Sequence, residues 1–215
     1  MNTTDHLTRS NDFNQIILGR RSIKKYDPSV KISREEMTEM LSKATRAPSS
    51  NNLQPWRFLV IESEKAKATL LALAQFNSHQ VVTSAAVIAI FGDLKHDTYA
   101  EEIFNTAVEL GYMPDDVKKQ LLAFTQNIYS TVSDTYRKDV ALIDGGLIAM
   151  QLMLVARAHG YDTNPIGGYD KDRIAEVFGM DKERFVPIML VSIGKADDDG
   201  HPSMRLPVDS VAEWK

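Results

Sequence analysis

Polar side chains are most concentrated in residues 47–56, which read Ala-Pro-Ser-Ser-Asn-Asn-Leu-Gln-Pro-Trp. Asparagine and glutamine both donate and accept hydrogen bonds, and serine adds a rotatable hydroxyl group. Pro48 and Pro55 restrict the backbone, so these groups could be held in place before a ligand arrives. The segment fits a binding site for a polar, ring-bearing ligand, but a surface loop rich in turn residues would have the same composition.

A basic segment, residues 20–26, lies upstream and reads Arg-Arg-Ser-Ile-Lys-Lys-Tyr. Arg20, Arg21 and Ser22 offer two cations and a hydroxyl group that suit a phosphate monoester. Lys24 could then reach another part of the same ligand. Two other interpretations explain the same cations, because they could complement the dipole of a preceding helix or belong to a solvated turn.

The composition of the 215-residue chain excludes several classes of protein. It contains 43% hydrophobic and 25% charged residues, which fits a single globular domain over residues 1–215. A net charge of −4 does not favour nucleic acid or an anionic membrane as a partner. The absence of cysteine excludes disulfides and thiolate chemistry, so any redox reaction would need a bound cofactor. The five histidines lie far apart, and we predict no metal site.

We also expect no targeting signal from this sequence. Residues 1–10 are polar and lack the apolar core of a signal peptide. We predict that no apolar run is long enough to span a membrane. A cytoplasmic location is therefore expected.

Apolar periodicity and turn residues divide the chain into the elements that would position the two polar segments. Helices are expected at residues 11–20, 33–46, 64–75, 133–159 and about 173–178, with a broken helical pattern over 97–129. Strands are expected at residues 58–61, 85–91 and 186–193, and residues 164–168 read as a tight loop. With no repeats and no linker, this pattern predicts one α+β domain.

The longest of these helices is apolar on nearly every side from residue 141 to residue 158. Such a helix is buried in a large core or at a subunit interface. Gly145 and Gly146 destabilise a helix interior, which predicts that another backbone packs closely against them.

Five motifs in order along the chain resemble those of the nitroreductase family of FMN-dependent oxidoreductases. They are residues 20–26, residues 47–56, Phe-Asn at 76–77, Pro-Ile-Gly-Gly at 165–168 and Arg-Leu-Pro at 205–207. The resemblance implies an α+β nitroreductase-like fold, with a central, mostly antiparallel sheet flanked by helices. It also implies an intertwined homodimer with FMN in the subunit interface, where the long helix would lie and the C-terminal segment would wrap the partner.

The resemblance also assigns expected roles to matching residues. Arg20, Ser22 and Arg205 would hold the phosphate and ribityl chain, and Lys24 and Asn77 would bond the pyrimidine end of the flavin. The remaining expected cofactor residues are Arg21, Pro48, Ser49, Ser50, Asn52, Gln54, Gln80, Pro165, Ile166, Gly167 and Gly168. Of these, the set from Pro48 to Gln54 would come mainly from the other subunit. Phe76 and Phe124 could line the acceptor pocket or be ordinary core aromatics.

The implied reaction transfers hydride from NAD(P)H to the flavin and then, by a ping-pong mechanism, to a nitroaromatic or quinone. The flavin would carry the chemistry, and Lys24 would support it by stabilising the negative charge of the reduced ring. Other flavin reactions remain open, namely reduction of an activated alkene, dehalogenation or flavin breakdown, as does a non-catalytic flavin-binding dimer. Two positions depart from many relatives. Ser203 in place of lysine weakens the match to a phosphate clamp near the C-terminus, and Gly167 in place of glutamate suggests a different subfamily and leaves the choice between NADH and NADPH open.

Overall fold

Four antiparallel strands form the central sheet in the computed structural model, which describes residues 9–215. They are β1 (Trp56–Ile61), β2 (Ala86–Asp93), β3 (Asp162–Ile166) and β4 (Phe185–Gly194), in the order β1-β2-β4-β3. The expected α+β class with a mostly antiparallel sheet is confirmed. The prediction that residues 1–10 form no signal peptide falls largely on residues 1–8, which lie outside the described residues, and the single domain over 1–215 stays a prediction.

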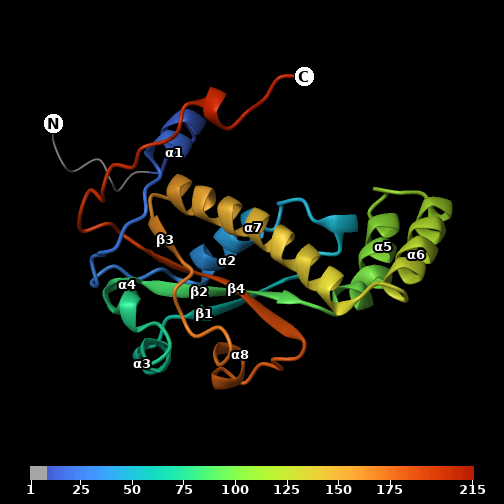
Figure 1. The fold of residues 1–215 in the computed structure, drawn as a ribbon, viewed down its shortest axis with the longest axis horizontal. Coiled ribbons are helices and arrows are strands. Elements are labelled where there is room, and N and C mark those ends of the chain that lie inside the picture. The colour runs from blue at the N-terminus through green and yellow to red at the C-terminus, as the bar shows by residue number, and fades with distance from the viewer. Residues whose placement is uncertain (1–8) are drawn as a thin grey trace.

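Helices cover both faces of this sheet (Figure 1). The helices are α1 (Phe13–Gly19), α2 (Arg34–Ala44), α3 (Glu64–Leu71), α4 (Ser78–Thr83), α5 (Ala100–Glu109), α6 (Asp115–Tyr129), α7 (Asp134–Ala158) and α8 (Ile174–Val177). Of these, α5 and α6 stand at one end of the sheet, away from its faces (Figure 1). Short 3-10 turns occur at η2 (Ser50–Asn52), η3 (Gln75–Asn77), η4 (His96–Tyr99) and η5 (Val208–Ser210). The Ser33 hydroxyl accepts a hydrogen bond from the Glu36 N–H and caps the start of α2.

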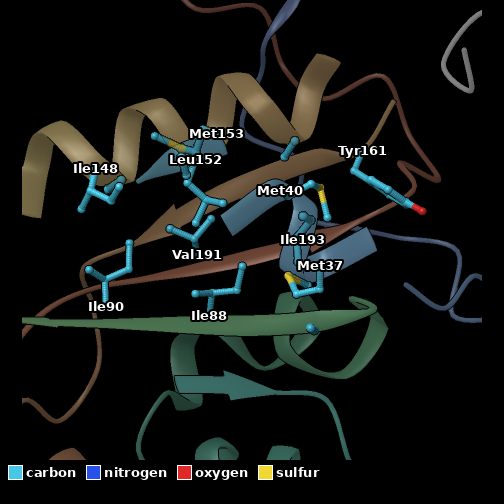
Figure 2. Packing of buried hydrophobic residues seen from close by; sticks show 14 of the residues in the cluster. Met37, Met40, Ile88, Ile90, Ile148, Leu152, Met153, Tyr161, Val191 and Ile193 are labelled. Carbon is cyan, nitrogen blue, oxygen red and sulfur yellow. The ribbon is translucent and has the colours of Figure 1, made fainter. Parts of the chain in front are cut away.

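The alternation of side chains along β2 divides the core into two layers. Ile88 and Ile90 pack with α2 and α7 on one face, where Figure 2 shows Met40 of α2 and Leu152 of α7 converging on the sheet. Val87, Ala89 and Phe91 point to the opposite face and pack with α3, α4 and α8. All eight residues of β2 are buried, as expected of an apolar central strand covered on both sides.

The 25-residue helix α7 lies across the sheet and is long and apolar enough to cross a membrane by length and composition alone. The prediction that no apolar run reaches that length was therefore wrong. Half of the helix's apolar window is buried inside the protein, and buried residues such as Ile148 pack on β2 and β4, so α7 is built as a core helix. Its opposite side leaves Ile143 and Leu147 exposed.

Gly145 explains how closely α7 approaches the sheet. A Cβ atom at Gly145 would lie 2.2 Å from Cδ1 of Ile188 on β4, so a larger residue there would require the Ile188 side chain to move. The predicted close approach therefore exists at Gly145, but it involves a side chain rather than a second backbone. A Cβ atom at Gly146 would meet no described atom within 4 Å.

Residues 164–168 were wrongly predicted as a tight loop, because most of this segment belongs to strand β3. The Asn-Pro-Ile-Gly-Gly composition is typical of a turn, but β3 is the edge strand next to β4, and an isolated bridge at Thr163 is the one strand-type pairing among residues 9–215 on its other side. A proline is tolerated at an edge, where its missing N–H does not interrupt a ladder. Only Gly167 and Gly168 lie beyond the end of the strand.

Candidate functional site

The basic segment runs in extended form beside β3. Ser22 forms a parallel bridge with Thr163, and the Ile23 N–H donates to the Thr163 carbonyl oxygen at 3.1 Å. Tyr26 ends the segment, and its N–H donates to the hydroxyl of Thr83 at the end of α4 at 3.2 Å. These contacts fix residues 22–26 against the edge of the sheet and next to α4.

The extended backbone sends alternate side chains to opposite sides. Ser22 and Lys24 line one cavity of about 160 Å³, together with residues 198–201. Arg21 and Ile23 line a different cavity of about 380 Å³ with Arg157. The structure thus separates Arg21 from Ser22 and Lys24, and by the same alternation we assign Arg20 to the side of Ser22 and Lys24.

One guanidinium nitrogen of Arg20 has no hydrogen-bond acceptor in the described part of the chain. This atom, Nη1, is buried and forms no hydrogen bond to any of residues 9–215. The hydroxyl of Thr163, beside Ser22, is also buried and has no hydrogen-bond partner in the described part of the chain. A buried guanidinium nitrogen without an acceptor is costly, so an anion that supplied one would be stabilised there.

Two side chains at the start of α4 complete this group. The Asn77 amide Nδ2 donates to the Gly168 carbonyl oxygen at 2.9 Å, and the Gln80 amide Nε2 donates to Asn77 Oδ1 at 3.2 Å. A Cβ atom on Gly167 would meet nothing within 4 Å, so the protein's own packing does not require glycine there. We call the following set the strand-edge group: Arg20, Ser22, Lys24, Asn77, Gln80, Pro165, Ile166, Gly167 and Gly168.

Residues 48–54 form a strained loop at the opposite end of the sheet, beside α5 and α6 (Figure 1). Asn51, Asn52 and Gln54 have φ angles of 51°, 54° and 48°, a conformation that costs residues other than glycine about 1–3 kcal/mol each. The Gln54 N–H donates to the Ser49 hydroxyl at 3.1 Å, which closes the loop. Leu53 is buried against α5 and α6 in a small cluster of its own.

A buried carboxylate holds the C-terminal end of this loop. Asp93 is fully buried at the end of β2 and accepts two hydrogen bonds of 2.8 Å from Arg184. It also pairs with Arg57 at 3.1 Å, and Arg57 in turn donates to the Gln54 carbonyl oxygen at 3.0 Å. Burial alone would raise the pKa of Asp93, but the hydrogen bonds from Arg184 and Lys95 and the charge of Arg57 outweigh it and lower the pKa.

A second buried carboxylate holds the N-terminal end. Asp144 on α7 accepts hydrogen bonds from the Ser50 N–H at 3.0 Å and the Ser50 hydroxyl at 3.2 Å. Burial raises the pKa of Asp144, and the two bonds from Ser50 oppose that rise. Sequence reasoning missed both carboxylates; a single acidic residue in the apolar centre of a long helix was the available signal for Asp144.

Apart from Arg21 and Arg205, the predicted site residues therefore lie in two separate groups within one chain. Pro48, Ser49, Ser50, Asn52 and Gln54 belong to the strained loop, with Phe124 half-exposed on the adjacent α6. Phe76 is 99% exposed next to Asn77, so it is not a core aromatic. Arg205 joins neither group, since it is exposed in the C-terminal segment and its Nη1 donates to Ser203 and to the Met204 carbonyl oxygen.

Comparison with known proteins gives a consistent picture. The family model described as Nitroreductase family matches residues 17–195. YdgI of Bacillus subtilis, named as a candidate NAD(P)H nitroreductase, is 60% identical over 209 residues, covering 97% of this chain and 100% of YdgI. A crystal structure of a candidate nitroreductase from Exiguobacterium sibiricum in complex with FMN has a TM-score of 0.95 at 60% identity, covering 97% of this chain and 100% of that one. The CLA biosynthesis enone reductase of Lactiplantibacillus plantarum is 37% identical over 188 residues, covering 87% of each chain.

The paired Asp93 makes the base of the loop sensitive to acid. Because its folded-state pKa is lowered, its stabilisation is complete above the ordinary carboxyl pKa of about 4 and is lost as pH falls through the lowered value. Asp93→Asn should reduce the free energy of unfolding at pH 7 by about 2–4 kcal/mol, because it removes the buried charge that pairs with both arginines. The loss stays in this range because the two arginines are partly exposed and can still be solvated. Urea denaturation at pH 7 and at pH 3 measures the difference between variant and wild type, which should narrow at pH 3.

Asp172→Asn is the matched control, because Asp172 is an exposed aspartate. It should change the free energy of unfolding by less than about 0.5 kcal/mol at either pH. A difference for Asp93→Asn that stays constant between pH 7 and pH 3 would contradict the ion-pair explanation.

Proposed function

This chain belongs to the nitroreductase family, and on that premise we propose that it is an FMN-dependent oxidoreductase that takes hydride from NAD(P)H and passes it to a small acceptor. The observation that carries the proposal is the buried Arg20 Nη1, which has no acceptor in the described part of the chain and lies on the strand-edge group. The relative solved in complex with FMN, at 60% identity, supports the same cofactor. FMN combines a phosphate anion with a flat polar ring, which matches the chemistry of this group.

The residues present fit such a cofactor. Arg20 and Ser22 would hold the phosphate and ribityl chain, and Lys24 would place a cation at the pyrimidine end, where negative charge develops on reduction. The open space beside Gly167 would let the backbone approach the ring closely. Bound FMN would supply the hydride chemistry, and the protein would supply position and charge.

The acceptor is the finer part of the proposal. The small-molecule acceptor would follow the nicotinamide into the same place in a ping-pong reaction, and a nitroaromatic or quinone fits the family. The 37% identical enone reductase favours reduction of an activated alkene as a second candidate function. Phe76 is fully exposed beside Asn77 and is available to contact such an acceptor.

A homodimer would bring the two separated groups together. The strand-edge group and the strained loop lie at opposite ends of one chain, so a second copy could place its loop and Phe124 over the strand-edge group of the first. Exposed apolar side chains support this arrangement. They are Phe13 and Leu18 on α1, Ile143 and Leu147 on α7, and Met204, Leu206, Val211 and Trp214 in the C-terminal segment. We place this dimer in the cytoplasm.

The purified protein should carry flavin absorbance bands near about 370 and 450 nm. Anaerobic NADH or NADPH should bleach them, and the faster nucleotide is the donor. Reoxidation by a nitroaromatic, a quinone and an enone, compared by rate, separates the candidate acceptors. Protein that is colourless and also fails to take up added FMN would overturn the proposal, and a flavin that no nucleotide bleaches would indicate a binder without turnover.

Arg20 and Arg21 offer a matched pair of substitutions. Arg20→Gln should weaken FMN binding about tenfold to a hundredfold, the value of a lost charge-assisted hydrogen bond to phosphate. Arg21→Gln should have a much smaller effect, because its side chain lines the other cavity. Fluorescence titration of FMN into the cofactor-free variants measures both, and equal losses would contradict the assigned sides.

The proposed dimer interface can be tested by introducing a glutamate on α7 and, as a control, on α8 on the other side of the sheet. Leu147→Glu on the exposed side of α7 should convert a particle of about twice 24.1 kDa to one of 24.1 kDa in sedimentation equilibrium, because a buried unpaired carboxylate opposes association. Val177→Glu on α8, across the sheet, should leave the mass unchanged. A wild-type mass of one chain would refute the dimer.

A further inference from the structure

Asp144 lies near the middle of α7, far in sequence from the loop that it contacts, and is only 2% exposed. Both of its carboxylate oxygens accept hydrogen bonds from one residue, Ser50. We propose that Asp144 is a positioning residue, which fixes residues 48–54 in the shape that receives the flavin cofactor. This inference rests on the proposed function, because the loop is assigned to the cofactor there.

The surroundings of Asp144 give it no other evident task. Among residues 9–215 it forms no ion pair with a lysine, arginine or histidine. An apolar side chain could fill the same space without burying a charge. The carboxylate is therefore explained by the two hydrogen bonds to Ser50, not by packing.

Ser50 is the point at which the loop needs an external acceptor. It is the first residue of η2, and the preceding Ser49 makes no side-chain capping bond to this turn. The Ser50 N–H would otherwise lack a partner, as the first N–H groups of a helical turn do. Asp144 supplies that acceptor from another element and also binds the hydroxyl.

The backbone conformation of the residues after Ser50 depends on this anchor. Asn51, Asn52 and Gln54 all have positive φ angles, so the loop relaxes unless its ends are held. Leu53 and the Arg57–Gln54 contact hold the later part, while Asp144 holds the beginning. Asn51 and Asn52 are then exposed on the outer side of the loop, where a ligand could reach them.

The test compares three variants in the absence and presence of FMN. Asp144→Leu removes both acceptors, so amide hydrogen exchange of residues 50–54 in the cofactor-free protein should accelerate about tenfold or more, while that of β2 stays unchanged. FMN binding, followed by fluorescence, should weaken about tenfold because the loop is no longer preorganised. Asp144→Asn should stay within about threefold of wild type in both measurements, since its amide oxygen accepts from the Ser50 N–H and its amide nitrogen donates to the hydroxyl.

Asp139→Asn, an exposed aspartate on the same helix, controls for the charge change and should match wild type in both measurements. If Asp144→Leu does not fold, Asp144→Ala removes both acceptors without adding bulk and tests the anchor by exchange in the cofactor-free protein, where unchanged rates overturn it. Faster exchange with unchanged FMN affinity overturns the positioning role. Failure of wild type to bind FMN refutes the proposed function instead, and wild-type binding with an unaffected Asp144→Leu variant refutes this inference alone.

Discussion

The complete burial of β2 is the constraint on which the other elements depend. Its backbone must be paired along both edges, so β1 and β4 flank it, and both of its faces must be covered by apolar layers. Because side chains alternate along a strand, the even-numbered Ile88 and Ile90 set the layer that contains α2 and α7, and odd-numbered residues set the layer of α3, α4 and α8. The tight contact of Gly145 with Ile188 then fixes how α7 lies on the sheet.

Two buried carboxylates connect this rigid core to the strained loop in chemically different ways. Asp93 is surrounded by arginines, which lower its pKa and hold it ionised, and it reaches the loop through Arg57. Asp144 pairs with no arginine among residues 9–215, burial raises its pKa, and it holds Ser50 directly. The unfavourable backbone conformation between these anchors persists because the surrounding structure holds it from both ends.

The candidate site residues lie in two groups at opposite ends of the chain, and our proposed function depends on this separation. One end of the chain presents cations, hydroxyls and glycines beside β3, and the other presents an amide-rich loop beside α6. Helix α7 runs between the two ends and exposes apolar side chains such as Ile143 and Leu147. In our proposal the second copy of the chain supplies the missing half, so that cofactor binding and association depend on the same surfaces.

The sequence by itself determined the apolar strand β2, the capped start of α2, the long helix α7 and the motifs that identify the family. Each of these is recorded in residues close together along the chain, where periodicity and capping act locally. Only the tertiary structure decided that Pro165 lies in an edge strand, because a partner strand overrides a turn-like composition. It alone also separated Arg21 from Arg20 and joined Asp144 to Ser50. The first depends on the side to which an extended segment turns its side chains. The second depends on residues 94 positions apart meeting in space. Neither can be predicted from a short stretch of sequence.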